Sequence, residues 1–287
     1  MEQLKLFIEL TRLKKPIGYM LLFWPCAWGL TIAYDFSREI NTYLFYLFLF
    51  FSGSILMRSA GCIVNDIVDR NYDKKVFRTK NRPIASGKVS VQAAIIYSLI
   101  LCLVAFIVLI QFNNLTIILA LGSMPLAFTY PLMKRYTYWP QLFLGVTFNY
   151  GLILGWTSIQ DGLNFFPILF YFGAIFWTIG FDTVYGFQDF KDDEIIGLKS
   201  TSIKFKKNYK LFLSICYSIF LIILILLGLI EKYSLIYFIL TIMIFLQLFY
   251  FQIFKLDIKN PNSCLKVFKS NNILGFLVFL NLILGKL

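Results

Sequence analysis

The chain has 287 residues, of which 59% are hydrophobic, a formal net charge of +12 and a mean hydropathy of +0.74. This composition is too apolar for a water-soluble domain of that size, and it predicts one domain over residues 1–287 that crosses a membrane repeatedly. The chain contains no histidine. That excludes His-based acid–base catalysis, catalytic triads that need His, and His-ligated transition metals. The five cysteines show no CxxC spacing and are expected to be buried thiols.

Apolar runs of membrane-spanning length recur along the chain and predict nine helices. We expect them at residues 16–34, 42–64, 91–111, 114–133, 139–158, 165–186, 210–230, 233–253 and 270–286. The first begins at Pro16, a residue that suits the first turn of a helix. The expected fold class is therefore all-α, a polytopic membrane protein.

Positive charge is distributed unevenly over the loops between these spans. If the N-terminus is cytoplasmic, 23 of the 27 lysines and arginines fall in cytoplasmic segments, Arg58 lies within a span, and only Arg38, Lys232 and Lys286 lie on the outer side. Because cytoplasmic loops are enriched in Lys and Arg, this split favours that orientation, and it explains the net charge without a nucleic-acid partner. The start of the chain shows no cleavable signal. The expected location is a bacterial cell inner membrane.

A first polar stretch, residues 58–87, follows the second span and passes abruptly from apolar to acidic and then to basic. Asn65, Asp69 and Asp73 are four residues apart, so on a helix they lie along one face, with Asp66 close beside them. Carboxylates stacked this closely need a cation to remain ionised together. Oxygen ligands without His or Cys indicate a hard cation, Mg²⁺ before Ca²⁺.

A cluster of basic residues follows this acidic face directly. It comprises Lys74, Lys75, Arg78, Lys80, Arg82 and Lys88. Acidic metal ligands next to cationic side chains suit a polyanion bridged by a metal ion, and a diphosphate is the usual case. The alternative interpretation is a solvated charged loop between two helices.

A second acidic stretch follows the sixth span. Asp182, Tyr185, Asp189 and Asp193 stand at offsets 0, 3, 7 and 11, and on one helix all four lie within about 80° of each other. Two such faces in one chain are expected to close on a shared metal–diphosphate from opposite sides.

Both stretches resemble known motifs. NDxxDxxxD over residues 65–73 with RTxxRPxxSG over 78–87, and DxxYxxxDxxxD over 182–193 with GLKST over 197–201, resemble the two motifs of the UbiA superfamily of intramembrane aromatic prenyltransferases. The blocks RLKKPIGYMLLFWPCAWGL, YPLMKRYTYWPQLFLG and CLKVFKSNNILG are similar to its 4-hydroxybenzoate polyprenyltransferase branch. One departure is Phe190-Lys191, where relatives often carry further charge.

The resemblance implies nine transmembrane helices around a central cavity that cytoplasmic loops cap. It implies Mg²⁺-dependent transfer of a polyprenyl group from polyprenyl diphosphate to the ring carbon of 4-hydroxybenzoate ortho to the hydroxyl, in ubiquinone biosynthesis. The reaction takes place in a lipid bilayer, and no protein partner is implied. Another acceptor (homogentisate, dihydroxynaphthoate or haem) is the alternative within the superfamily. An ion or solute transporter and a non-catalytic scaffold are the alternatives from other classes.

With the resemblance, the acidic residues receive roles. The first choices for Mg²⁺ ligands are Asn65, Asp69, Asp189 and Asp193, and Asp66 and Asp73 come second, acting through water. Solvation of helix ends is the alternative for these side chains. Asp182 and Tyr185 lie deeper on the second face than Asp189, where they orient the phenol hydroxyl or bond the cationic residues. A structural hydrogen-bonding role for this pair is an equal alternative.

The basic residues supply candidates for both substrates. Those for the diphosphate are Arg78, Arg82, Lys134 and Lys199, although topology alone would also explain each. Arg58 stands inside the second span, about 10 Å below Asn65, and is expected to line the cavity. Arg135 is our choice for the benzoate carboxylate because a guanidinium binds a carboxylate through two hydrogen bonds. Arg12 and Arg58 compete for that role. The prenyl chain length and the oligomeric state do not follow from the sequence.

Overall fold

The computed structural model describes residues 2–287, and all regular secondary structure within that range is helical. The long helices are α2 (Ile17–Ala33), α3 (Ile40–Asp73), α4 (Val91–Leu109), α5 (Asn114–Thr129), α7 (Pro140–Thr157), α8 (Phe165–Gly186), α11 (Tyr209–Ile230), α12 (Leu235–Leu246) and α13 (Pro261–Lys286). The short helices are α1 (Glu2–Leu10), α6 (Met133–Tyr136), α9 (Phe190–Ile195) and α10 (Thr201–Lys204). A 3₁₀ turn, Tyr130–Leu132, joins α5 to α6, and a π-helical segment, Gln247–Phe254, continues α12.

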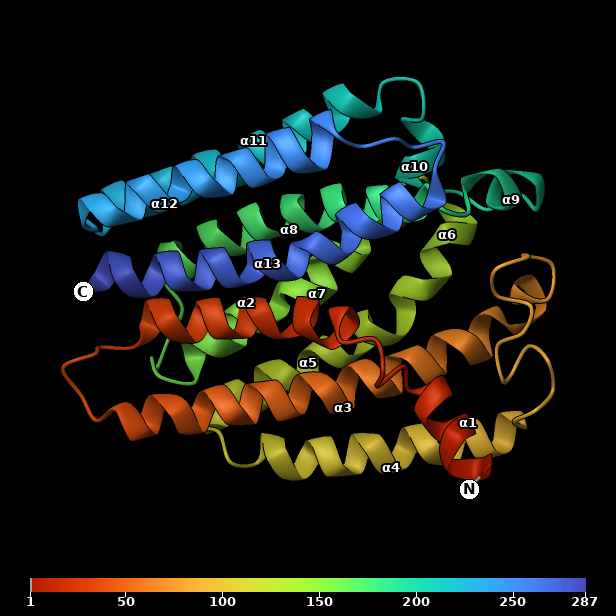
Figure 1. Cartoon of the computed structure of the whole chain (residues 1–287). Helices are drawn as coiled ribbons and strands as arrows, with labels where there is room; N and C mark the ends of the chain where they lie inside the picture. The colour runs from red at the N-terminus through yellow and green to blue at the C-terminus, as the bar shows by residue number, and fades with distance from the viewer. Residues whose placement is uncertain (1) are drawn as a thin grey trace.

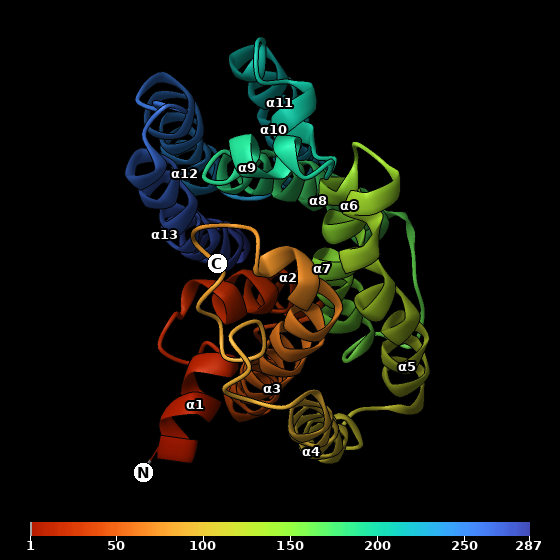
Figure 2. The ribbon, with the colours of Figure 1, turned by 90° about the vertical axis from the view of Figure 1, so that its right-hand side faces the viewer.

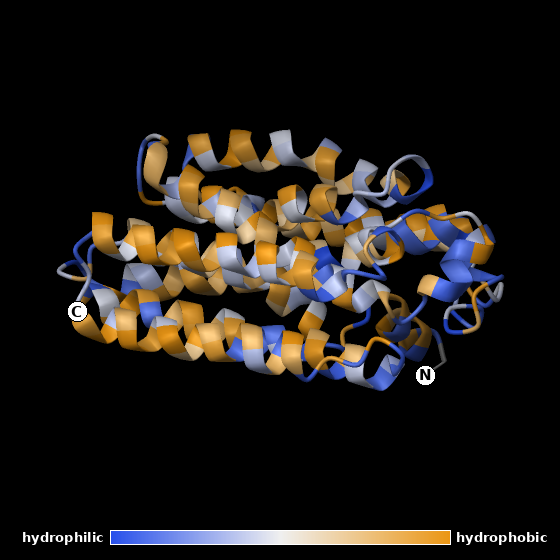
Figure 3. Cartoon of the chain, turned by 90° about the horizontal axis from the view of Figure 1, so that it is seen from above, coloured by the Kyte–Doolittle hydropathy of each residue, from blue (hydrophilic) through white to orange (hydrophobic). Residues whose placement is uncertain are grey.

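The long helices lie side by side and run along one common direction (Figure 1). Viewed from one end of the bundle, α11 and α12 lie at one edge and α4 lies at the opposite edge (Figure 2). The short helices α1, α6, α9 and α10 gather at the same end of the bundle (Figure 1). Hydropathy follows this division, because the long helices are mostly apolar and hydrophilic residues concentrate at the end that carries the short helices (Figure 3). We call it the polar end.

The outer helices present apolar side chains to their surroundings. Leu103 of α4 and Ile118 of α5 are 65% and 67% exposed. Within the described residues, seven helical segments are long and apolar enough to cross a membrane: Ile40–Asp73, Val91–Leu109, Asn114–Tyr136, Phe165–Gly186, Tyr209–Ile230, Leu235–Phe254 and Pro261–Lys286. The chain is therefore a helical membrane protein of several spans, as the composition predicts.

The predicted count of nine spans is not established by this criterion. A helix lies at each of the nine predicted ranges, but α2 has only 17 residues and α7 does not reach the same apolar content. These two helices pack tightly against each other. A Cβ placed on Gly155 of α7 would lie 2.3 Å from the carbonyl oxygen of Cys26, and one on Gly29 of α2 would lie 2.0 Å from that of Leu152. Each helix thus shields part of the other from lipid, so α7 does not need a surface as apolar as that of a lipid-facing helix.

An aromatic cluster joins the inner helices. The ring of Trp28 lies 5.0 Å from that of Trp177 and 5.6 Å from that of Phe170. Each indole N–H is satisfied inside the bundle: Trp28 donates to the carbonyl of Gly275 at 3.0 Å, and Trp177 donates to Asn271 Oδ1 at 2.8 Å. The cluster therefore connects α2, α8 and α13 and holds the bundle in a fixed arrangement below the polar end.

Helix ends differ from the sequence prediction at three places. The second span does not stop at residue 64, because α3 continues unbroken to Asp73. The prediction of one continuous helix over residues 182–193 is wrong, since α8 ends at Gly186 and Asp189 (φ −120°, ψ 1°) precedes the new helix α9. The last helix begins at Pro261 rather than residue 270, because Asn260 Oδ1 caps it by accepting from two backbone N–H groups.

Candidate active site

The predicted site residues lie at or near the polar end, where the last turns of α3 meet the loop over residues 74–90, α6 and the turn between α8 and α9 (Figure 1). Because α3 continues to Asp73, the first acidic series does occupy one helix. Asp66, Asp69 and Asp73 are 2%, 1% and 7% exposed. Burying three carboxylates this closely requires partners, since each would otherwise lose its hydration without compensation.

Asp69 is held by the short helix α6. The Lys134 ammonium donates to Asp69 Oδ2 at 2.5 Å. The Arg135 guanidinium donates to the carbonyl of Val68 at 2.8 Å, and its Nη2 lies 3.7 Å from Asp69 Oδ1. Within the described residues, Asp69 Oδ1 is buried and accepts no hydrogen bond. One acceptor oxygen at the centre of the first motif is therefore free to bind a cation.

Arg82 closes the loop back onto α3. Its Nη1 lies 3.0 Å from Asp66 Oδ1 and 2.9 Å from Asp73 Oδ2. Asp66 Oδ1 also accepts from Arg12 Nη2 at 2.5 Å, which brings the segment after α1 into the same network. The Thr79 hydroxyl donates to the carbonyl of Asp73 at 3.1 Å. Asp66 and Asp73 are thus neutralised by arginines and fix the loop conformation.

Arg78 connects the first motif to the second. Its Nε donates to both carboxylate oxygens of Asp189, at 2.8 and 2.9 Å, and its Nη2 pairs with Asp189 Oδ2. Its Nη1 lies 3.2 Å from the Tyr185 hydroxyl, and its guanidinium carbon lies 5.5 Å from the centre of that ring. A side chain from the loop after α3 therefore reaches across to the end of α8, so the two motifs meet in space.

Asp193, in α9, has no ion pair within the described residues. Burial raises the pKa of Asp193 to about 6, and the negative charge of Asp189 adds to this, against the opposing charges of Lys134 and Arg78. Its backbone carbonyl accepts from the N–H of Leu198 at 2.9 Å, which folds the GLKST segment back toward α9. The negative charge of Asp193 is therefore less well compensated than those of Asp69 and Asp189, which have ion-pair partners.

Lys199 is anchored at the rim of the site. Its ammonium donates to the carbonyl of Tyr136 at 3.2 Å and lies 5.7 Å from the centre of the Tyr138 ring. Its backbone N–H donates to the carbonyl of Lys134 at 2.8 Å. The segment after α9 and helix α6 therefore support each other, and the Lys199 charge lies on the outer side of α6.

Arg58 lies deeper, seven residues before Asn65 on α3. Its guanidinium carbon lies 5.3 Å from the centre of the Phe148 ring, and its buried Nε finds no hydrogen-bond acceptor within the described residues. A Cβ on Gly18 would lie 2.8 Å from that nitrogen, so the absence of a side chain at Gly18 leaves room for the guanidinium. Asp182 is likewise deeper than Tyr185, one turn earlier on α8.

Tyr130, which sequence reasoning missed, lies in the same region. Its ring is 6.4 Å from that of Phe148, the ring that Arg58 covers. The available signal was its place at the start of the YPLMKR block, directly after the fourth span. A tyrosine at the foot of a helix is also a common interface anchor, so the pattern alone does not distinguish the two roles.

The oxygen atoms of the candidate metal ligands suit a hard cation. All these ligand atoms are oxygens, and the buried Asp69 Oδ1 accepts no hydrogen bond within the described residues, so the chemistry fits Mg²⁺. Within the described residues, however, no three acidic or cysteine side chains converge on one point. Basic side chains separate them, because Lys134 holds Asp69 and Arg78 holds Asp189. The cations that let these carboxylates coexist are thus side chains of the protein.

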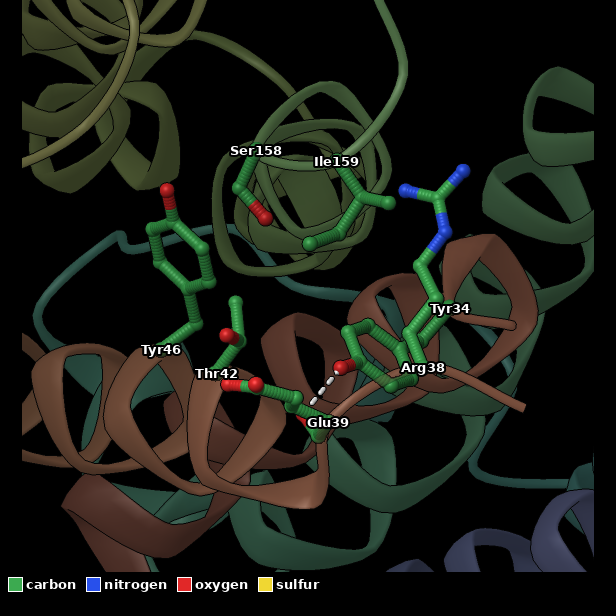
Figure 4. Close-up of a pocket in the computed structure, with 7 residues that line it drawn as sticks. All are labelled: Tyr34, Arg38, Glu39, Thr42, Tyr46, Ser158 and Ile159. Carbon is green, nitrogen blue, oxygen red and sulfur yellow. Dashed lines mark hydrogen bonds between the residues drawn. The ribbon is translucent and has the colours of Figure 1, made fainter. Parts of the chain in front are cut away.

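A separate cavity of about 390 Å³ lies at the opposite end of the bundle (Figure 4). It is lined by Tyr34, Arg38, Glu39, Thr42, Tyr46, Ser158 and Ile159. None of the predicted site residues lines it. The cavity therefore does not mark the candidate active site, which lies at the polar end where the acidic and basic residues meet.

Comparison with known proteins relates this arrangement to a family. Residues 22–283 match the UbiA prenyltransferase family. The human mitochondrial 4-hydroxybenzoate polyprenyltransferase is 43% identical over 98% of this chain and 75% of that protein. The 4-hydroxybenzoate octaprenyltransferase of Psychromonas ingrahamii is 40% identical over 100% of this chain and 98% of that protein.

Solved structures share the fold. The UbiA homologue from Aeropyrum pernix superposes with a TM-score of 0.77 at 20% identity, over 95% of this chain and 98% of that one. The UbiA homologue from Archaeoglobus fulgidus bound to GPP and Mg²⁺ superposes with a TM-score of 0.71 at 18% identity, over 97% and 99% of the two chains. The fold, the two acidic motifs and the full-length relatives agree, and the chain belongs to the UbiA prenyltransferase family.

Proposed function

We propose that this protein transfers a polyprenyl group from polyprenyl diphosphate to 4-hydroxybenzoate, at the ring carbon ortho to the hydroxyl, as a step of ubiquinone biosynthesis. The relatives that carry the name 4-hydroxybenzoate polyprenyltransferase match almost the whole chain at about 40% identity. The single observation that carries the proposal is the meeting of two acidic motifs with Arg78 and Lys134 at the polar end of an apolar bundle. Such a place suits a substrate with a charged head and a hydrocarbon tail.

Asn65, Asp69, Asp189 and Asp193 are the residues that would hold Mg²⁺. The free oxygen of Asp69 and the under-compensated carboxyl of Asp193 support this choice. Asp66 and Asp73 form ion pairs with Arg82, so they would contact the metal only through water, or they would fix the conformation of the loop over residues 74–90. When bound, Mg²⁺ would neutralise charge on the diphosphate as it leaves. The Archaeoglobus fulgidus homologue bound to GPP and Mg²⁺ is consistent with this assignment.

Arg78 and Lys134 are the basic residues best suited to the diphosphate. Both neutralise a proposed metal ligand, so both lie where they would contact a diphosphate bound beside those carboxylates. Their charges then stabilise the leaving diphosphate while the allylic C–O bond breaks. Arg82 bonds two aspartates and keeps a supporting role, and Lys199 acts from the rim. The electron-rich ring carbon forms the new C–C bond, and loss of the ring proton restores aromaticity.

The acceptor carboxylate needs a guanidinium away from the metals. Arg135, the residue favoured from sequence, lies 3.7 Å from Asp69, where a benzoate carboxylate would compete with the diphosphate. Arg58 lies about three turns before Asp69 on α3, and its buried Nε has no hydrogen-bond partner within the described residues. An unpaired buried donor is costly, so a ligand oxygen is the natural partner. These observations support Arg58 as the carboxylate partner, with Arg135 as the rival.

We also propose that the polar end faces the cytoplasm from a bacterial inner membrane. The concentration of lysine and arginine in the loops of that end supports the orientation. Among the relatives, the 4-hydroxybenzoate octaprenyltransferase of Psychromonas ingrahamii is bacterial, and others are mitochondrial.

The test is transfer by the purified full-length protein in lipid nanodiscs. Labelled 4-hydroxybenzoate is incubated with polyprenyl diphosphates of several lengths, with Mg²⁺ or with EDTA, and products are identified by mass spectrometry. We expect prenylated 4-hydroxybenzoate only with Mg²⁺. Homogentisate and dihydroxynaphthoate serve as rival acceptors. Product from a rival alone would reassign the substrate, and no product from any acceptor would contradict the activity.

A further inference from the structure

A basic pocket lies beside α1, outside the motifs described above. It is lined by Lys5, Ile8, Glu9, Arg12, Lys14 and Lys15 and has a volume of about 360 Å³. Four of its six lining residues are cationic and one is acidic. A cavity of this size has room for a phosphate-bearing headgroup. We call it the α1 pocket.

Three of the four positive charges of the α1 pocket have no ion-pair partner, whereas Arg12 pairs with Asp66. Lys5, Lys14 and Lys15 are exposed, and none forms an ion pair with any side chain that the structure describes. The basic residues of the candidate active site differ, because Arg78, Arg82 and Lys134 each contact an aspartate. Like charges gathered around one cavity raise the local potential and favour an anionic ligand.

Arg12 links the α1 pocket to the active site. Its φ of +56° lies in the left-handed region, which residues other than glycine rarely adopt. In this conformation the guanidinium reaches Asp66, and the backbone carbonyl accepts from the N–H of Lys15 at 2.8 Å. One residue therefore contacts both a lysine of the pocket and an aspartate of the first motif. Strain of this kind is retained where the surrounding contacts demand it.

The α1 pocket adjoins the start of an apolar helix. Helix α2 begins at Ile17, two residues after Lys15. Leu4, the neighbour of Lys5 in sequence, is 63% exposed. Helix α1 packs across α4 through Phe7, whose ring lies 5.4 Å from that of Tyr97. Positive-inside topology explains why lysines occur on this side. It does not explain a cavity lined by an arginine that adopts a left-handed conformation and pairs with Asp66.

We propose that the α1 pocket binds the phosphate group of an amphiphile whose hydrocarbon tail lies in the bilayer. Two sources carry that chemistry: an anionic phospholipid of the membrane, and the diphosphate head of the prenyl donor before it reaches the metal ligands. Only the second source rests on the proposed function. In either case Lys14 and Lys15 hold the phosphate, and Arg12 transmits its presence to Asp66.

The test compares two double variants of the full chain with equal loss of charge. The first is Lys14→Gln with Lys15→Gln. The control is Lys207→Gln with Lys210→Gln, two exposed lysines outside the pocket. Native mass spectrometry measures the binding of phosphatidylglycerol and of geranylgeranyl diphosphate. Transfer kinetics are measured in phosphatidylcholine nanodiscs with and without phosphatidylglycerol. Lys5→Gln repeats the comparison if the first variant does not fold, as judged by circular dichroism.

Each outcome is decisive. Removing two charges should weaken the bound phosphate about ten- to thirty-fold, and the control should match the wild type. Weaker phosphatidylglycerol binding with an unchanged donor KM assigns the pocket to phospholipid. A raised donor KM in phosphatidylcholine alone, with kcat unchanged, assigns it to the donor. If both ligands bind as in the control, the proposal is wrong. If the wild type transfers nothing, the proposed function fails, while the phosphatidylglycerol measurement still decides on the pocket.

Discussion

At the scale of single residues, the candidate site consists of aspartate side chains that form ion pairs with arginine and lysine side chains. The four-residue spacing in the first motif was enough to predict that Asn65, Asp69 and Asp73 share a helical face, because α-helix geometry is local. It was not enough to predict that Lys134 would bind Asp69 or that Arg78 would bind Asp189. Those partners are 65 and 111 residues apart in the chain, and only the tertiary fold decides which of many cations reaches which carboxylate.

The metal ligands give the most direct prediction at this scale. Asp69→Asn and Asp189→Asn each keep the side-chain shape and remove a charge that would bind Mg²⁺. We expect each to lower kcat by about 100-fold or more, because stabilisation of the leaving diphosphate is lost. The measurement is initial transfer rate at saturating Mg²⁺, with Asp161→Asn, an exposed residue of the α7–α8 loop, as the matched control. Near-normal turnover in either site variant would contradict the shared metal site.

The acceptor assignment separates two arginines. We expect Arg58→Lys to raise the KM for 4-hydroxybenzoate about 10-fold or more, because a point charge cannot replace a bidentate guanidinium. Arg135→Lys should act mainly on the diphosphate, since Arg135 lies beside Asp69. Steady-state kinetics with each substrate varied in turn measure both effects. The reverse pattern would restore Arg135 as the carboxylate partner.

At the scale of elements, the second motif shows where periodicity misleads. Offsets of 0, 3, 7 and 11 fit one helix, yet α8 stops at Gly186 and α9 begins after Asp189. The spacing of polar residues alone does not show where one helix ends and the next begins. The turn reorients Asp189 toward Arg78, so the interruption is what brings the second motif onto the first. Likewise, sequence predicted helices near α2 and α7 but not their close contact through glycines.

That contact predicts a stability effect. Gly155→Ala would place a methyl group 2.3 Å from a backbone oxygen of α2, so the helices must separate. We expect a loss of about 1–3 kcal/mol in the free energy of unfolding, the usual cost of overpacking. Gly53→Ala is the control, because a Cβ there meets no atom within 4 Å. Thermal unfolding of the two detergent-solubilised variants measures the effect. Equal Tm values for Gly155→Ala and Gly53→Ala would show that the α2–α7 contact accommodates a methyl group without loss of stability.

At the scale of the whole molecule, charge and hydropathy divide the bundle into an apolar body and one polar end (Figure 3). Composition and loop charge were sufficient to predict this division, because both depend on sums over many residues and not on particular contacts. The number of membrane spans was harder to predict from the sequence. Helix α2 is apolar but short, and it shields α7, so the sequence of α7 need not be as apolar as that of a lipid-facing span.

Orientation can be measured directly. In a background without native cysteines, Lys75→Cys and Lys207→Cys should resist a membrane-impermeant thiol reagent in intact cells. Both positions are exposed at the polar end, which we assign to the cytoplasm. Asp161→Cys, at the opposite end, should react and shows that the reagent works. Labelling of Lys75→Cys and Lys207→Cys with protection of Asp161→Cys would invert the assignment.

The pairing of Arg78 with Asp189 and of Lys134 with Asp69 has a thermodynamic consequence for the order in which ligands arrive. A divalent ion that enters alone must displace a guanidinium or an ammonium and leave it without a counter-ion. A diphosphate that enters alone must compete with the carboxylates for the same cations. When both enter, each compensates the charge that the other displaces, so the two binding events are cooperative, and linkage makes that cooperativity reciprocal.

We therefore expect inorganic diphosphate to tighten Mg²⁺ binding at least about ten-fold, equivalent to a coupling of about 1.4 kcal/mol. Titration calorimetry, corrected for complex formation in the buffer, measures the effect, and equal Mg²⁺ affinities with and without diphosphate would contradict it. Because the coupling is mutual, this result would mean that the free protein binds divalent ions weakly and that the prenyl donor completes the proposed metal site.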